Sequence, residues 1–201
     1  LTMTVKITIL SLIIALVIGI FVCLMNISSN IVLRGIAKFY IWLIRGTPML
    51  VQAFYFYFAL PQLVQAVTGS QFRITVFTAS LVTLALNAGA YISEIFRGSI
   101  ESVNKGQMEA ARSLGLSYAK SMQKIILPQA VRICLPSLVN QFIITLKDST
   151  ILYAIGLSEV MYNVGRTMES FATYTWVAVF FLLIVTVLSF ISRYVERRMN
   201  A

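Results

Sequence analysis

The sequence GQMEAARSLGLSYAKSMQKIILPQA, from Gly106 to Ala130, is a compact polar stretch inside an otherwise apolar chain. Its EAA triplet at residues 109–111 predicts the beginning of a short helix, because an acidic side chain is favoured at the positive end of the helix dipole. The paired alanines leave a thin face that another surface can approach closely. Gly115 predicts the end of this helix, since glycine adopts a left-handed backbone at little cost. A second short helix is predicted from Ser117 to Lys124, and Pro128 predicts a change of chain direction.

The composition of the whole chain is that of an integral membrane protein. Hydrophobic residues make up 59% of the 201 residues and charged residues only 11%, far from the averages of soluble domains. Although the formal net charge is +9, the chain offers no soluble basic face for nucleic acid, and basic residues in membrane proteins mark cytoplasmic loops. Cys23 and Cys134 lie in apolar segments, which favours packing over a disulfide or a metal site. We therefore expect one transmembrane domain over residues 1–201, and no nucleic-acid partner.

The gaps between charged residues predict the membrane spans, since a spanning helix needs roughly 20 apolar residues. The uncharged gaps are Ile7–Leu33, Gly46–Phe72, Ile74–Ser93, Ile133–Leu146 and Ser170–Ser192. The fourth gap becomes long enough if its helix starts at Pro128 or Gln129. We therefore predict an all-α protein with five transmembrane helices, and we expect further residues before Leu1.

The basic residues predict the orientation of these helices. One set of alternate loops and the C-terminal tail contain Arg34, Lys38, Arg45, Arg97, Lys105, Arg112, Lys120, Lys124, Arg132, Arg193, Arg197 and Arg198. The other side contains only Lys6, Arg73, Lys147 and Arg166. Because basic residues accumulate in cytoplasmic loops, we predict an external N-terminus and a cytoplasmic C-terminus. The opening segment then lies in a cytoplasmic loop at about residues 104–128.

Between the first two spans, Asn30, Arg34 and Lys38 recur every four residues within an apolar stretch. This spacing predicts a helix that lies along the inner membrane interface. We expect Thr47 to cap the second span, with Pro48 in its first turn, where no amide donor is needed.

The spacing in the opening segment resembles the EAA loop of the membrane subunits of bacterial ABC importers. The match consists of E-A-A, three residues, Gly115, nine residues and then Ile125-x-Leu127-Pro128. RGTPMLVQ at residues 45–52, NAGAYISEIFRGSIESVNKGQ at 87–107 and LKDSTILYAIGLSEV at 146–160 also resemble permeases of the polar amino acid uptake family. The resemblance covers nearly the whole chain.

This resemblance implies a type I ABC importer fold and a permease that translocates a polar amino acid across the bacterial inner membrane. Its expected partners are two ABC ATPase subunits, a second permease subunit that is identical or homologous, an extracytoplasmic amino acid binding protein and the lipid bilayer. ATP and Mg would be bound by the ATPase, because the chain has no G-x-x-x-x-G-K-[ST] loop and no cofactor is expected in it. The coupling helix would dock on the ATPase. The predicted coupling residues are Glu109, Ala110, Ala111, Gly115 and Leu116.

Two other classes of protein are possible. An ion-coupled amino acid carrier or a channel would also have several spans with a few intramembrane polar residues, but neither requires a cytoplasmic coupling loop at this spacing. An intramembrane serine protease would fit the Gly156-Leu157-Ser158-Glu159 segment, but the chain has no histidine to activate the serine.

Polar residues on the spans indicate the solute path, because each is costly in hydrocarbon and must face protein, water or ligand. Two stripes at helical spacing are formed by Thr83, Asn87, Tyr91 and Glu94 on the third span and by Gln141, Thr145 and Asp148 on the fourth. Hydrogen bonds between helices are the alternative role, above all for Asn87 and Thr145. Glu94 is either a gate or a packing residue.

We predict a substrate site made of Asn87, Tyr91, Gln141, Thr145 and Asp148. The carboxylate of Asp148 suits a substrate ammonium, and the amide of Gln141 favours an uncharged polar amino acid over a cationic one.

Overall fold

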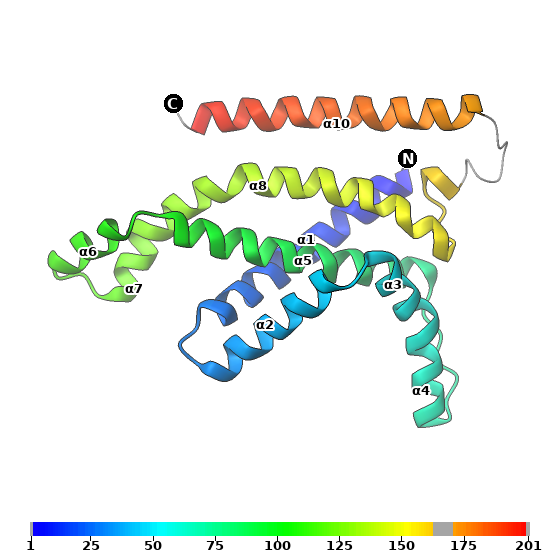
Figure 1. The fold of residues 1–201 in the computed structure, drawn as a ribbon, viewed down its shortest axis with the longest axis horizontal. Helices are drawn as coiled ribbons and strands as arrows, with labels where there is room; N and C mark the ends of the chain where they lie inside the picture. Colours follow the sequence, from blue (N-terminus) through cyan, green and yellow to red (C-terminus); the bar gives the residue numbers. More distant parts are fainter. Residues whose placement is uncertain (1, 163–170, 200–201) are drawn as a thin grey trace.

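The computed structural model describes residues 2–162 and 171–199, and the described regular structure is all helical (Figure 1). The α-helices are α1 (Thr2–Ile27), α2 (Ile31–Gly46), α3 (Met49–Phe54), α4 (Leu60–Thr68), α5 (Val76–Ser102), α6 (Lys105–Ser113), α7 (Tyr118–Ser121), α8 (Leu127–Asp148) and α10 (Phe171–Met199). Two π-helical turns, Tyr55–Ala59 and Met122–Ile126, and a 3-10 helix, Ser149–Ile155, continue these helices. Arg166 and the start of the predicted fifth span lie outside the described residues.

Within the residues that the structure describes, five helical segments are long and apolar enough to cross a membrane, as predicted. They are Thr2–Ile27, Met49–Thr68, Val76–Ser102, Tyr118–Ile155 and Phe171–Phe190. The first ends before its predicted limit at Leu33, because the chain turns at residues 28–30.

Helix α5 is the centre of the bundle, and α1 packs along it through small residues. A Cβ on Gly19 would lie 2.5 Å from Cγ2 of Ile92, and one on Gly89 would lie 2.8 Å from Cγ2 of Ile18. Ala15 and Ala88 are buried at the same contact. Small residues let the two backbones approach closely, which is the main route to helix association in a membrane.

Helix α2 confirms the predicted helix between the first two spans but not its flat orientation. Asn30 is the N-cap, and its side chain accepts hydrogen bonds from the backbone N–H groups of Val32 and Leu33. Further on, the hydroxyl of Tyr40 donates to the carbonyl of Leu86 at 2.6 Å, in the middle of α5. The helix therefore rises along α5 towards the middle of the bundle (Figure 1), because its inner face has polar and small residues that α5 can accept.

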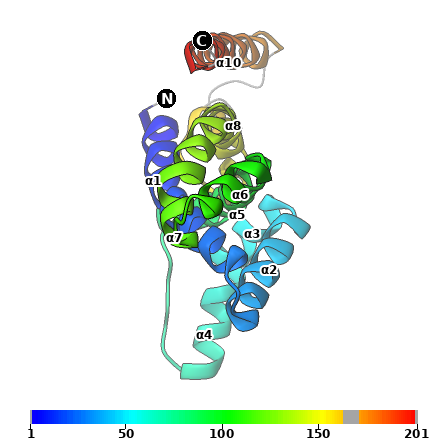
Figure 2. The ribbon, with the colours of Figure 1, turned by 90° about the vertical axis from the view of Figure 1, so that its left-hand side faces the viewer.

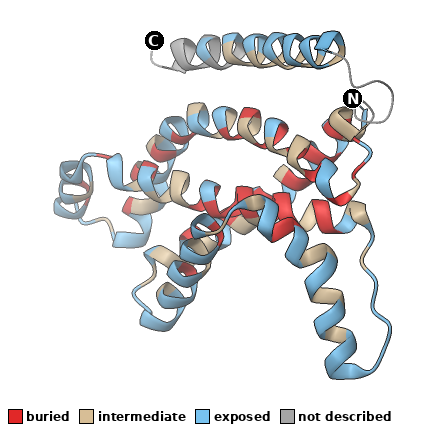
Figure 3. Ribbon diagram, turned by 45° about the vertical axis from the view of Figure 1, so that its right-hand side comes forward, coloured by how far each residue is buried: buried red, intermediate tan, exposed pale blue. Residues whose placement is uncertain are grey.

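The corner between α2 and α3 corrects the predicted cap. Pro48, not Thr47, is the N-cap of α3. The Thr47 hydroxyl instead donates to the carbonyl of Leu43 at 2.8 Å, so it closes the end of α2. After α3, the chain turns away from the bundle through Tyr55–Ala59, and α4 projects from it with no buried residue (Figures 2 and 3).

Helix α8 begins at Leu127, with Pro128 in its first turn, close to the predicted start at Pro128 or Gln129, but the chain stays helical before it, so that Tyr118–Ile155 is one continuous helical segment. Proline has no N–H and clashes with the carbonyl four residues earlier in a regular helix. Here the π turn Met122–Ile126 precedes it, and the N–H of Leu127 bonds to the carbonyl of Met122, five residues back. The wider turn makes room for the proline ring. The turn Tyr55–Ala59 precedes Pro61 in the same way, with the Leu60 N–H on the Tyr55 carbonyl.

The last helix, α10, lies alongside α8 and stands apart from the remaining helices (Figures 1 and 2). None of the residues in its spanning segment, Phe171–Phe190, is buried within the chain. Its apolar side chains therefore face lipid or another subunit.

Candidate functional site

A cavity of about 560 Å³ opens where the end of α2 and the start of α3 meet α5 and α8. Its volume is in the range of small-molecule sites. Asn87 and Tyr91 of α5 and Gln141 and Asp148 of α8 line it, together with Arg45 near the end of α2. The two polar stripes predicted from sequence thus converge on one cavity, and four of the five predicted substrate-binding residues line it. Their role in binding stays a prediction.

Thr145, the fifth predicted residue, does not line this cavity, but it forms hydrogen bonds with Gln141, which does. It is buried, and its hydroxyl donates to the Gln141 carbonyl at 2.9 Å. The same hydroxyl oxygen accepts from Nε2 of Gln141 at 3.3 Å. Thr145 is therefore placed to orient the Gln141 amide.

We expect Thr145→Val to weaken apparent substrate affinity by about twofold to tenfold, the effect of one hydrogen bond, while assembly is unchanged. Valine keeps the shape but removes the hydroxyl that holds Gln141. The measurement is the KM of uptake in sealed vesicles. Thr83→Val is the matched control, because Thr83 is also buried and bonds to a carbonyl four residues earlier, that of Ala79, outside the cavity. Equal KM values in the two variants would contradict the orienting role.

Gln52 belongs to the site although sequence reasoning gave it no role. Its side chain is buried, its Nε2 lies 2.7 Å from the Ile44 carbonyl and 2.8 Å from Oγ1 of Thr47, and its Oε1 accepts from Nδ2 of Asn87 at 3.3 Å. It fixes the corner between α2 and α3 against α5. The only signal was its place at the end of the RGTPMLVQ stretch.

Arg45 has a second role beyond the loop charge that predicted orientation. Its guanidinium carbon lies 5.0 Å from the centre of the Tyr91 ring, a cation–π contact, and its Nη1 lies 3.6 Å from Oε2 of Glu94. Arg45, Tyr91 and Gln141 also line a second cavity of about 610 Å³, which Glu94 reaches. Arg45 therefore stands between two adjoining cavities.

Glu94 ties three helices together. Its carboxylate accepts from Nε and Nη2 of Arg97 at 2.9 and 2.8 Å and from Nδ2 of Asn26 on α1 at 3.3 Å. Arg97 also donates to Glu101 at 2.6 Å. These contacts give Glu94 a definite packing role, whereas a gating role stays a prediction.

Asp148 differs from Glu94 because no cationic side chain in the described part of the chain forms an ion pair with it. Its side chain is half-buried at the cavity, and its carboxylate forms no hydrogen bond or ion pair with any residue in the described part of the chain. The neighbouring Lys147 is exposed. A half-buried carboxylate without a partner is costly, so a cationic ligand group would stabilise this site.

The polar segment that includes the EAA triplet folds as a rigid turn at one end of the bundle. Helix α6 begins at Lys105, before the predicted start at Glu109, because the Asn104 side chain accepts from the Gly106 N–H at 2.8 Å and caps it. Gly115 is left-handed, with φ +80, as predicted. The N–H of Leu116 bonds to the Ala111 carbonyl and that of Gly115 to the Arg112 carbonyl, the paired bonds of a Schellman motif.

The predicted coupling residues divide into an exposed group and an inward group. Glu109, Ala110 and Gly115 are exposed, whereas Ala111 is buried and Leu116 is half-buried. The predicted thin face of two alanines is therefore wrong for Ala111, which is only 2% exposed and faces the chain. The residue missed by sequence reasoning is Leu114, which is 83% exposed at the tip.

An apolar cluster connects this segment to the spanning helices. Val103, Ile126 and Ala130 are buried together, and Met108 of α6 and Met122 pack against them. A displacement of α6 would therefore be transmitted to α8.

A bundle of apolar helices with a polar cavity and a rigid polar turn at one end is the structure of a transport subunit in a membrane. Residues 5–201 match the family described as binding-protein-dependent transport system inner membrane component, and the chain belongs to this family.

Known proteins agree with this assignment. The chain is 40% identical over 202 residues to the glutamine transport system permease protein GlnP of Escherichia coli (strain K12), covering 98% of this chain and 90% of that protein. It is 39% identical over 205 residues to the arginine transport system permease protein ArtQ of Bacillus subtilis (strain 168), covering 100% and 91%. A solved amino acid ABC transporter with histidines superimposes with a TM-score of 0.91 at 38% identity, covering 98% of this chain and 91% of that one.

These findings confirm the predicted fold class and the predicted kind of function. The chain is a permease subunit of an ABC importer and an inner membrane component. They favour this function over an ion-coupled carrier or a channel. They also set aside the protease interpretation of Gly156–Glu159.

Proposed function

We propose that this permease carries an amino acid through the cavity between α5 and α8. The observation that carries the proposal is that Arg45 and Asp148, of opposite charge, line the same cavity. Every free amino acid has a carboxylate and an ammonium, so Arg45 is suited to the first and Asp148 to the second. Asn87, Tyr91 and Gln141 complete the wall, with Thr145 behind Gln141. The names of the relatives, which concern glutamine and arginine, support an amino acid as the cargo.

The substrate in this proposal is a polar amino acid without a net charge on its side chain. The two relatives named above are nearly equally similar to this chain, so their names do not decide between glutamine and arginine. In this proposal the substrate backbone uses both charged residues of the cavity wall, its carboxylate at Arg45 and its ammonium at Asp148. A cationic side chain would then be left without a carboxylate and would be repelled by Arg45.

The intact complex should therefore be inhibited more strongly by uncharged polar amino acids than by basic ones. We expect about tenfold or greater preference in a competition panel of amino acids against uptake in sealed vesicles, the discrimination produced by one uncompensated charge. A methyl ester of the best inhibitor is the control, because it keeps the side chain but removes the carboxylate that Arg45 would bind. Stronger inhibition by arginine or lysine than by any uncharged amino acid would contradict the proposal.

The proposal includes the partners that convert ATP hydrolysis into transport. Two ABC ATPase subunits would bind ATP and Mg, and this chain would supply no cofactor. A second permease subunit, identical or homologous, would complete the membrane part, and an extracytoplasmic binding protein would deliver the amino acid. Glu109, Ala110, Leu114 and Gly115 offer an exposed surface for the ATPase, with Ala111 and Leu116 supporting it from within.

The orientation in this proposal places α6 and α7 in the cytoplasm, the N-terminus outside and the C-terminus inside. The concentration of Lys and Arg in and around α6 and α7, at residues 105, 112, 120, 124 and 132, supports this orientation.

A further inference from the structure

A third cavity, of about 740 Å³, lies where α1 ends and α2 begins. Arg34, Lys38 and Trp42 of α2, Arg97 and Glu101 of α5, and Tyr118 of α7 contribute to its wall. It is outside the cavity assigned to the substrate, and nothing in the proposed transport step uses its α2 residues.

The charges in this cavity are unevenly matched. Both acids in its wall, Glu94 and Glu101, are bound by Arg97, and Glu94 is also paired with Arg45. Arg34 and Lys38 form no ion pair with any residue among those the structure describes. Being four residues apart on one helix, they project from the same face. Two cations of α2 are thus left for an anionic group from outside the chain.

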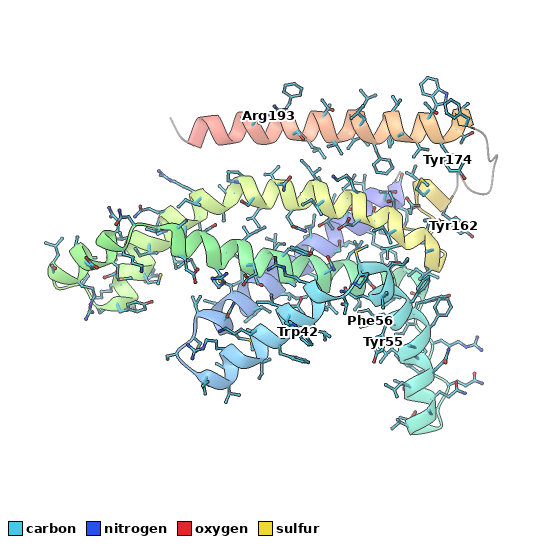
Figure 4. All side chains as sticks on the ribbon, viewed as in Figure 1. Trp42, Tyr55, Phe56, Tyr162, Tyr174 and Arg193 are labelled. Carbon is cyan, nitrogen blue, oxygen red and sulfur yellow. The ribbon has the colours of Figure 1, made fainter. Side chains whose placement is uncertain are left out.

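The surroundings of these cations are those of a membrane interface. Trp42 is 68% exposed and Tyr118 is 60% exposed, and Trp and Tyr gather where the hydrocarbon meets the headgroups. Figure 4 shows Trp42 on α2, next to the side chains of that helix. On the same helix, Ile31 is an exposed apolar residue on the side of the two cations, and the ring of Phe39, also exposed, lies 5.9 Å from that of Trp42. The cavity also lies at the ends of two spanning helices, α1 and α5, which is the level of lipid phosphates.

We propose that this cavity binds the phosphate of an anionic phospholipid through Arg34 and Lys38, with the acyl chains against the exposed apolar face of α2. Basic pockets between membrane helices near the headgroups are suited to such lipids. A free phosphate would satisfy the same two cations but would leave the adjoining apolar and aromatic surface unused. The inference goes beyond the proposed function, since it requires neither the substrate nor the ATPase.

The test measures retention of phosphatidylglycerol by the intact protein, purified in detergent and exposed to mixed phosphatidylglycerol and phosphatidylcholine, with bound lipid counted by native mass spectrometry. We expect selective binding of phosphatidylglycerol, and about tenfold to thirtyfold weaker binding in the double variant Arg34→Gln, Lys38→Gln, from the loss of two lipid-facing cations. Lys120→Gln is the matched control, because Lys120 is an exposed cation at the same end of the bundle but outside this cavity.

Two further arms separate the alternatives. Inorganic phosphate at the same concentration should not displace the bound lipid, and equal displacement would show a free-phosphate site and overturn the lipid proposal. If the double variant does not elute as a single species, Lys38→Gln alone decides, since Lys38 is exposed and one cation should contribute about fivefold. Binding that is unchanged in these variants, or reduced equally by Lys120→Gln, would also overturn it.

Discussion

A complex carrying Asp148→Asn should assemble normally and lose most of its amino acid uptake. Asparagine keeps the size and much of the hydrogen bonding but removes the charge. Asp148 forms no ion pair or hydrogen bond within the described residues, so the variant breaks no contact with a cation of the chain. A hydrogen bond to a charged group contributes about 1.5–3 kcal/mol, which corresponds to an increase of about ten- to 150-fold in the KM of uptake.

The control for Asp148→Asn is Glu101→Gln, which removes one carboxylate from an exposed position outside the cavity and leaves its partner Arg97 bound to Glu94. That variant should keep the wild-type KM. A second arm uses an N-acetylated substrate, which has no ammonium. If Asp148 binds the ammonium, this analogue should inhibit wild type and Asp148→Asn equally weakly. Wild-type kinetics in Asp148→Asn would make the residue a packing group and move the site elsewhere in the bundle.

The proposed path would require Arg45 to exchange partners as substrate passes between the two cavities that it lines. Arg45 is paired with Glu94 at 3.6 Å, whereas Arg97 binds both oxygens of the same carboxylate at 2.8 and 2.9 Å. If a substrate carboxylate draws Arg45 away, Glu94 therefore keeps its ion pair with Arg97. Because the longer contact is the weaker of the two, Arg45 can exchange partners without uncovering a buried charge.

Hydrophobic periodicity and the positions of charged residues predicted the features of this site that are set within a single helix, namely its span and its polar face. The spacing of Asn87 and Tyr91 and of Gln141 and Asp148 placed each pair on one helix face, and the structure turns both faces to one cavity. The charge-free gaps predicted the spans, since a charge inside hydrocarbon is costly wherever the helix packs. These forces act locally and leave a pattern in the sequence.

The features that sequence could not provide depend on how helices meet. Arg45 reaches the site because α2 runs along α5. The direction of α2 is fixed by tertiary contacts such as the hydrogen bond from the Tyr40 hydroxyl to the Leu86 carbonyl, and hydrophobic periodicity does not predict such contacts. Pro128 predicted a change of chain direction, but the sequence did not reveal that the preceding residues stay helical through the π turn Met122–Ile126. Ala111 is buried although Ala110 beside it is exposed, a difference that the EAA triplet does not predict. Each depends on tertiary contacts that override a local preference.

Replacing Gly115 by valine should leave the permease inserted but uncouple ATP hydrolysis from uptake. Gly115 has a φ of +80, and a Cβ added there meets no atom within 4 Å, so the strain lies in the backbone and not in a clash. A left-handed residue with a side chain costs about 1–2 kcal/mol, and a β-branched one more. The strain would open the Schellman bonds from Gly115 and Leu116 and displace Leu114 from the tip.

The comparison of Gly115→Val with Gly115→Asn isolates this cause. Asparagine adds a side chain of similar size but tolerates the left-handed region, so it should keep most of the coupling. In the purified complex, we expect Gly115→Val to hydrolyse ATP without a matching rate of uptake, with uptake at least about tenfold lower, the factor that 1.4 kcal/mol of strain produces. Normal uptake by Gly115→Val at normal expression would refute the coupling role. An equal loss in both variants would show that surface crowding, and not the backbone turn, governs contact with the ATPase, because only the valine strains the turn.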